Sequence, residues 1–338
     1  MKKQMITVFT LLCFLMTGIL SGCEEIPYTV TDREYYKTHT GTEESNTTFP
    51  QWEDKTGKKD DMDETSGIIT DCMLRTGVET DSYGDASKKD KKVVIPANMT
   101  FDILDMDGNF FQVEFDGTKV WLPSNNCLIN VKQFIPTLEV DLSLSHSPNY
   151  YNIDGNSITG LTDLQLYNNE GSVDGSEVWL RYEVAEKLLK AQEIFLKDGY
   201  SIKVIDAYRP NSATIALKDG FNEYLKTSEG RDLRQEYMTG YEPGSFLEQN
   251  ESPHNYGAAV DITLVDIDSG NELSMPSDIY ALDASSVYDT WCVLSDERTS
   301  HGEYIRGKMA ECGFVISDTK WWHFYVDSIE RTVFDIPN

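Results

Sequence analysis

Apolar residues are distributed unevenly along this 338-residue chain, and their distribution limits where the chain can fold. Residues 5–20 are predominantly apolar, whereas residues 24–66 are polar, charged and poor in aliphatic side chains. A segment of the second kind cannot bury enough apolar surface to offset the conformational entropy that is lost on folding. We therefore expect a disordered tether over residues 23–66 and folded domains from residue 67 onward.

The charge and composition exclude several classes of protein. The chain has 29 Lys and Arg against 57 Asp and Glu, a formal net charge of −28. Phosphate backbones repel such a chain, which argues against a general nucleic-acid binder. The 23 Gly and 11 Pro follow no repeat, and no long apolar segment follows residue 20, so collagen-like and polytopic membrane proteins are also excluded.

The N-terminus has the order of features found in an export signal. A short basic region precedes an apolar run that is shorter than a typical membrane span. The tetrapeptide Leu20-Ser21-Gly22-Cys23 resembles the lipobox of bacterial lipoproteins, where cleavage precedes a lipidated Cys. The resemblance implies that residues 1–22 are removed and that Cys23 anchors the protein on the extracellular side of the cell membrane. A plain secretory signal with an incidental Cys is the alternative.

Four further cysteines remain after the signal and the anchor, namely Cys72, Cys127, Cys292 and Cys312. Disulfides persist outside the cytoplasm, and four cysteines allow three connectivities. We expect the pairs Cys72–Cys127 and Cys292–Cys312, each within one domain. Four buried free thiols are the alternative.

Residues 67–131 predict five short strands joined by tight turns. Asp107-Gly108-Asn109 and Asp116-Gly117 are turn signals, and short apolar or alternating runs lie between them. Such strands are typical of a small β-barrel. Their order resembles a bacterial SH3-like domain, which implies either binding of peptidoglycan peptides or a packing module without a ligand.

From residue 132 to residue 338 the pattern changes to mixed helix and strand. Helices and strands interleave without a strict βαβ repeat, which favours an α+β fold. The apolar periodicity predicts helices over 182–197, 211–226 and 303–312, and strands over 200–205, 258–264 and 321–326.

Two segments of this second domain carry residues that suit a metal ion. His254 and Asp261 lie seven residues apart around Gly257, and His323 follows a pair of tryptophans. Two imidazoles and a carboxylate are a plausible ligand set for Zn²⁺, with the fourth position open. The alternative is a core histidine in an apolar strand beside an ordinary buried carboxylate. The other histidines, His39 in the tether, His146 and His301, are interpreted as structural or exposed.

Three motifs in fixed order resemble those of the D-alanyl-D-alanine dipeptidase family, the vancomycin-resistance type of zinc peptidase. They are S-x-H-x-x-G-x-A-x-D at 252–261, W-W-H at 321–323 and D-x-Y-R-P at 206–210. The resemblance covers about residues 134–330. It implies a central antiparallel sheet flanked by helices, a Zn²⁺ cofactor, and hydrolysis of D-Ala-D-Ala or a related cell-wall peptide in peptidoglycan metabolism.

The resemblance also implies roles for matching residues. Arg209 would donate to the oxyanion with its fixed guanidinium fork, and Ser252 would help to hold the dipeptide. Asp278 or Asp283 would pair with the amino group of the substrate. The implied metal ligands are His254, Asp261 and His323.

One position departs from the family pattern. The family has a catalytic Glu three residues before the last His, and this chain has Lys320 there. A protonated ammonium cannot accept a proton from the attacking water, and a metal ion repels it. A Lys320 deprotonated by desolvation, or Asp318 on the same face of the strand, are the possible substitutes. The expected function is therefore a zinc peptidase, or an impaired member that binds cell-wall peptides; a structural protein without metal is the third hypothesis.

Overall fold

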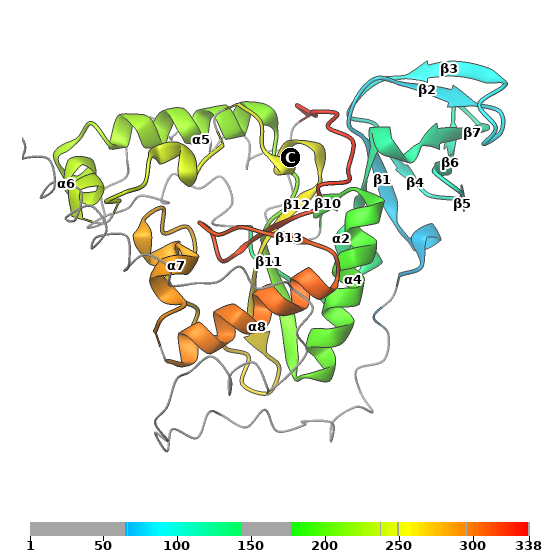
Figure 1. Ribbon diagram of the computed structural model, residues 1–338. Coiled ribbons are helices and arrows are strands. Elements are labelled where there is room, and N and C mark those ends of the chain that lie inside the picture. The colour runs from blue at the N-terminus through cyan, green and yellow to red at the C-terminus, as the bar shows by residue number, and fades with distance from the viewer. Residues whose placement is uncertain are drawn as a thin grey trace, which may run out of the picture. The chain divides into compact units, whose positions relative to one another are not determined.

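The computed structural model describes residue 65 and residues 67–142, 177–236, 238–248, 250–294 and 296–336 (Figure 1). These residues all belong to one compact unit, Thr47–Asn338. The signal sequence, Cys23, nearly all of the tether, His39 and His146 lie outside the described residues. Within the described part of the chain, no helix has the length and apolar character needed to cross a membrane.

Residues 67–131 form eight strands, three more than expected, and these lie in two sheets. The two predicted turns are present, and both Asp116 and Gly117 have positive φ angles, as a two-residue hairpin turn requires. The five-stranded sheet has the order β3 (Lys91–Ile95), β2 (Thr80–Tyr83), β7 (Thr118–Pro123), β6 (Phe110–Phe115), β5 (Asp105–Asp107).

The second sheet connects the two predicted domains. Its order is β10 (Trp179–Leu180), β8 (Cys127–Asn130), β1 (Met73–Thr76), β4 (Thr100–Asp102). Leu180 of β10 pairs with Ile129 of β8, so a strand from beyond residue 131 completes a sheet of the N-terminal region. A short helix, α2 (Val131–Phe134), follows β8 directly.

The C-terminal region is α+β, as predicted, with a largely antiparallel central sheet. Only the pairing of β9 with β11 is parallel among its described strands. The sheet has the order β13 (Val315–Ile316), β14 (His323–Tyr325), β12 (Ala259–Asp266), β11 (Tyr200–Asp206), β9 (Glu139–Val140). Its main helices are α4 (Tyr182–Lys197), α5 (Asn211–Tyr224), α6 (Ser228–Glu236), α7 (Tyr288–Trp291) and α8 (Glu297–Glu311).

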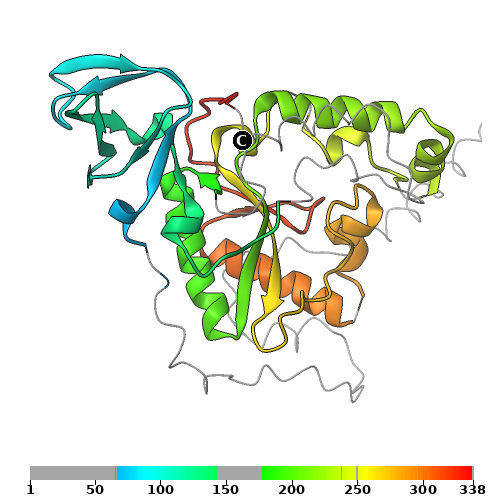
Figure 2. The same ribbon diagram turned by 180° about the vertical axis from the view of Figure 1, so that it is seen from behind.

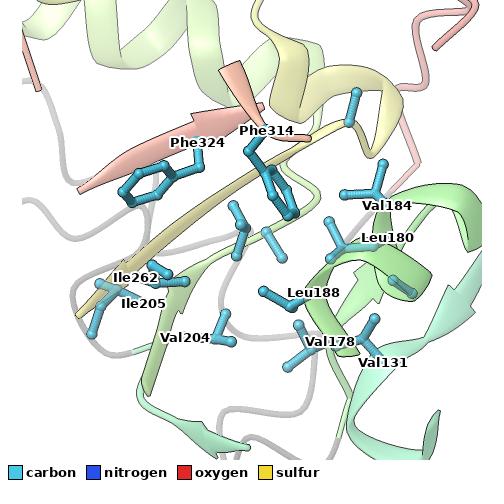
Figure 3. Packing of buried hydrophobic residues seen from close by; sticks show 14 of the residues in the cluster. Val131, Val178, Leu180, Val184, Leu188, Val204, Ile205, Ile262, Phe314 and Phe324 are labelled. Atoms are coloured by element: carbon cyan, nitrogen blue, oxygen red, sulfur yellow. The ribbon is translucent and has the colours of Figure 1, made fainter. Parts of the chain in front are cut away.

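Helices α4 and α8 pack on the same face of this sheet. Both lie in front of β11 and β12 in Figure 1 and behind them in Figure 2. The predicted apolar stripe of α4, which consists of Val184, Leu188, Ala191 and Phe195, is completely buried. Figure 3 shows Val184 and Leu188 between the helix and side chains of the sheet such as Val204. Burial of each large apolar side chain contributes roughly 1.5–3 kcal/mol, so this layer holds the strands that carry the site.

The expected disulfides are not formed, because none of the four described cysteines is in a disulfide. Cys127 is opposite Thr76 across the β1–β8 ladder, and Cys72 lies just before β1, four residues and about 13 Å from Thr76 along an extended chain. Cys292 follows Trp291, whose carbonyl accepts the Thr299 hydroxyl in the first turn of α8, while Cys312 is the C-cap of that helix, about 20 Å along its axis. Because a disulfide needs Cα atoms within roughly 7 Å, strand offset and helix length exclude both pairs.

Candidate metal centre

Three elements bring the predicted metal ligands together. Asp261 in β12 and His323 at the start of β14 are direct partners across an antiparallel ladder, so their side chains lie on one face of the sheet. His254 lies in the 3₁₀ helix η7 (Pro253–Tyr256), just before β12. All three residues are buried.

The chain around η7 has a conformation that fixes His254. The hydroxyl of Ser252 accepts a hydrogen bond from the His254 N–H, and the Asn255 amide oxygen accepts one from the Ser252 N–H at 2.7 Å. Gly257 ends η7 with φ 65°, and a Cβ there would lie 2.3 Å from Leu128 Cδ2. The positive φ and this close contact together require glycine at this position.

The ligand atoms form a compact triangle. His254 Nε2 lies 3.3 Å from Asp261 Oδ1, which lies 2.8 Å from His323 Nδ1. The two imidazole nitrogens are 3.2 Å apart. A tetrahedral Zn²⁺ bound at about 2.0–2.1 Å holds its ligand atoms about 3.3–3.4 Å apart, so the donors fit such an ion in both type and spacing.

A hydrogen bond at the other ring nitrogen sets the tautomer of His254. Its Nδ1 lies 2.5 Å from the carbonyl oxygen of Ala207, which only accepts hydrogen bonds. The ring proton therefore resides on Nδ1, and the Nε2 lone pair faces Asp261 and His323. A metal-binding histidine is typically oriented in this way by a backbone carbonyl or a carboxylate.

The electrostatics favour the ligating forms of these residues. Burial, aided by the charge of Lys320, lowers the pKa of His323 to about 4, so its ring is neutral at pH 7. Burial alone would raise the pKa of Asp261, but its interactions with His254 and His323 outweigh burial and hold that pKa well below its usual value. An ionised carboxylate beside the neutral ring of His323 suits a divalent ion.

Arg209 and Ser252 lie beside this triangle. The Arg209 guanidinium donates from Nη1 to Asp206 Oδ2 at 2.9 Å and from Nε to Thr214 Oγ1 at 3.2 Å. Its Nη2 points toward the Ser252 hydroxyl at 3.4 Å, and its backbone N–H donates to the His254 carbonyl. The D-x-Y-R-P segment at the end of β11 and η7 are thus joined directly, which brings the predicted oxyanion donor and dipeptide-holding residue to the candidate metal centre.

Neither candidate for binding the substrate amino group has a described contact with the triangle of ligands. Asp278 is exposed, and Asp283 caps the short helix η8 (Ala284–Ser286) by accepting the N–H of Ser285 at 2.7 Å. Neither is among the described residues that line the cavity at His323. Their role stays a prediction. His301, by contrast, is buried with Nδ1 2.8 Å from the Ser274 carbonyl, a structural arrangement as expected.

The proposed substitute base Asp318 also points elsewhere. Its carboxylate pairs with Arg306 at 2.9 Å and is largely exposed. The expectation that it shares a strand face with Lys320 is wrong, because β14 starts only at His323 and Asp318 lies in a bend before it.

Lys320 itself is nearly buried and has a partner that the sequence did not reveal. Its Nζ lies 2.8 Å from Glu248 Oε1, and only 10% of the lysine side chain is exposed. Glu248 lies in an irregular segment after the 3₁₀ helix η6 (Pro243–Ser245). No motif or periodicity marks it; the one available signal was that a lysine beside a metal centre requires a counter-ion.

A cavity of about 350 Å³ adjoins the centre. Its lining includes His323, Lys320 and Glu248, together with Glu251, Asp327 and Arg331. This volume lies at the lower end of the range for small-molecule sites. The candidate metal centre is therefore open to a small, charged ligand on the side of His323.

This fold with this set of ligands is typical of a metal-dependent hydrolase. Comparisons with known proteins indicate the type of hydrolase. Residues 168–335 match the peptidase M15 family, described as D-ala-D-ala dipeptidase. Curated relatives are the D-alanyl-D-alanine dipeptidases of Enterococcus faecium, 28% identical over 49% of this chain and 84% of the relative, and of Synechocystis sp., 31% identical over 38% of this chain and 60% of the relative. This part of the chain is a metallopeptidase of the D-alanyl-D-alanine dipeptidase type.

Two solved structures were also found. The LdcB LD-carboxypeptidase is 16% identical, with a TM-score of 0.26 over 46% of this chain and 61% of that chain. The vancomycin-resistance D,D-pentapeptidase VanY in complex with Zn(II) is 15% identical, with a TM-score of 0.27 over 45% of this chain and 75% of that chain. TM-scores this low support no conclusion about the fold or the site of this chain.

Proposed function

We propose that this protein is a zinc-dependent peptidase that hydrolyses D-Ala-D-Ala or a related cell-wall peptide in peptidoglycan metabolism. The observation that carries the proposal is the triangle of His254, Asp261 and His323, whose donor atoms have the spacing of a tetrahedral site. The relatives that match this region are named for the same dipeptide.

The residues at the site have different roles in the proposed reaction. Zn²⁺, when bound, supplies a Lewis acid for the peptide carbonyl and lowers the pKa of a water molecule. Arg209, which Asp206 and Thr214 hold on two sides, offers N–H donors to the carbonyl oxygen as negative charge develops there. Ser252 and the cavity beside His323 orient the peptide.

A second candidate function is binding of cell-wall peptides without cleavage. The observation that favours it is Lys320, an ammonium where the family has its proton-accepting Glu. In that case Lys320 would pair with a peptide carboxylate. Lack of turnover in the wild type, together with strong turnover in Lys320→Glu, would support this candidate.

We further propose that Cys23 carries a lipid anchor, that the protein stands on the extracellular side of the cell membrane, and that residues 67–131 are an SH3-like module. The lipobox-like tetrapeptide supports the first two proposals, and the tightly turned strands of residues 67–131 support the third.

The test begins with the metal. Elemental analysis of the purified protein should give about one zinc per chain, and incubation with D-Ala-D-Ala should release free D-Ala. His254→Ala should lose both zinc and turnover. His301→Ala, which removes another buried histidine bonded to a backbone carbonyl, is the matched control and should keep both. Wild-type protein without zinc would contradict the proposal, and zinc with saturable peptide binding but no release would favour the second candidate.

A further inference from the structure

The pair formed by Glu248 and Lys320 is the feature of the site that the proposed function does not explain. Lys320 lies three residues before a predicted metal ligand, and its Nζ is 2.8 Å from Glu248 Oε1. Glu248 and His323 line the same cavity. The family's Glu position is occupied by Lys320 in this chain, but a carboxylate still lies beside it. That carboxylate belongs to Glu248, which is 72 residues away in the sequence.

The backbone places Glu248 independently of this ion pair. The Thr319 hydroxyl donates to the Ser245 carbonyl oxygen at 2.7 Å, which joins the segment before Glu248 to the turn before Lys320. Phe246 is completely buried and packs against Tyr241, with ring centroids 5.8 Å apart. The carboxylate is therefore held at the cavity by backbone docking and by an aromatic anchor.

The charges around Glu248 keep it ionised. Burial opposes ionisation, but the charge and hydrogen bond of Lys320 and the charge of Arg209 hold the pKa of Glu248 well below its usual value. These two residues are the cation at the family's Glu position and the predicted oxyanion donor. Glu248 thus lies within electrostatic reach of both.

We propose that Glu248 is the proton acceptor of the reaction and that Lys320 positions it; this inference rests on the proposed peptidase function. As the water oxygen bonds to the carbonyl carbon, one water proton passes to the Glu248 carboxylate. Glu248 then gives this proton to the peptide nitrogen while the carbon–nitrogen bond breaks, so that the carboxylate is regenerated. The products are an amino acid with a new carboxylate and one with a free amine.

The competing explanation is that Glu248 only neutralises a buried ammonium. An unpaired charge in a buried place is unfavourable, so either role predicts that Glu248→Gln is harmful. The two roles differ when both charges are removed. Lys320→Met combined with Glu248→Gln no longer has a charge to neutralise, yet it still lacks a proton acceptor.

The experiment measures turnover of D-Ala-D-Ala, zinc content and unfolding temperature in the same set of full-chain proteins. Glu248→Gln should lower kcat by about 10²–10⁴-fold with KM and zinc content unchanged. The double variant K320M/E248Q should regain unfolding temperature relative to Glu248→Gln but not kcat. The double variant K320E/E248Q, which returns a carboxylate to the family position, should recover at least about tenfold of the lost kcat.

Glu272→Gln is the matched control, because Glu272 also pairs with a lysine, Lys203, at 2.8 Å but is not among the described residues that line the cavity. It should leave kcat within about twofold of the wild-type value. Recovery of kcat in K320M/E248Q, full activity in Glu248→Gln, or loss of zinc from Glu248→Gln would each overturn the proposal while the peptidase function stands. A wild-type protein that binds zinc but never turns over peptide would refute the peptidase function and this inference with it.

Discussion

At the scale of single residues, the metal centre depends on the imidazole of His323, which stays neutral in the folded protein at pH 7. His323 is buried beside the ammonium of Lys320, and these two causes lower its pKa to about 4 from the usual histidine value of 6.5. An imidazole that resists protonation keeps its lone pair for a metal ion. The same resistance makes the metal-free protein sensitive to acid.

The free energy of unfolding of the metal-free protein should fall as the pH is lowered from about 6.5 to about 4. In this range the unfolded chain binds a proton at His323 that the folded chain excludes, so stability rises with pH and is complete above the window. A shift from 6.5 to about 4 corresponds to about 3 kcal/mol. Urea unfolding of chelator-treated protein across this window measures the effect.

The control for this prediction is a variant that removes the titrating ring. His323→Gln should flatten the dependence, whereas His301→Gln should retain the wild-type slope. An equal slope in the wild type and in His323→Gln would show that other groups cause the acid sensitivity.

The sequence predicted the metal centre because its three ligands lie in short ordered motifs. Glu248 could not be predicted in this way. Its position depends on the docking of residues 245–248 against the turn at 317–320, which is a contact between distant segments. Asp318 was the nearer carboxylate in sequence, but Arg306 binds it on the outside.

At the scale of elements, prediction succeeded where burial is regular and failed where it is not. Helix α4 has the predicted bounds, because its apolar stripe runs along its whole length. Helix α8 starts at Glu297 rather than at 303, because Asp296 caps a first turn that has little apolar periodicity. The expected strand over 321–326 shortens to His323–Tyr325, since Trp321 and Trp322 are buried in a turn.

The turn that ends η7 allows a matched test of local geometry. Gly257→Ala combines a positive φ with a close contact to Leu128, whereas Gly270→Ala has a similar φ and nothing within 4 Å. We expect Gly270→Ala to cost about 1–2 kcal/mol from backbone strain alone. Gly257→Ala should cost about 1–3 kcal/mol more from the added overlap.

Denaturant unfolding of both variants measures this difference, and zinc titration gives a second readout. Gly257→Ala should also weaken zinc binding, because the backbone shift displaces His254, whereas Gly270→Ala should not. Equal stability and equal zinc affinity in the two variants would mean that the contact with Leu128 relaxes without effect on η7.

At the scale of the whole molecule, a small second core connects the N-terminal sheet to the metal-binding region. It consists of Leu128, Trp179, Tyr208, Phe334 and Ile336. The Tyr208 hydroxyl donates to the Ile336 carbonyl at 2.8 Å, and Phe334 lies under the guanidinium of Arg181. Arg181 in turn donates from Nε to the Tyr256 carbonyl at 2.8 Å, next to η7. The C-terminal segment therefore links the N-terminal sheet to the metal-binding region through contacts that no local sequence pattern predicts.

Because this core and strand β10 are shared, the described N-terminal and C-terminal regions should unfold together. Phe334 is completely buried, and Phe334→Ala should lower the free energy of unfolding by about 3–5 kcal/mol. Differential scanning calorimetry should show one transition in the wild type and a single transition at lower temperature in the variant, with the calorimetric enthalpy equal to the van't Hoff enthalpy in both. Two separate transitions, of which only one moves in Phe334→Ala, would mean that the shared strand and the second core do not couple the regions. In that case the N-terminal sheets would be an independent module, and the metal centre would not depend on them for its stability.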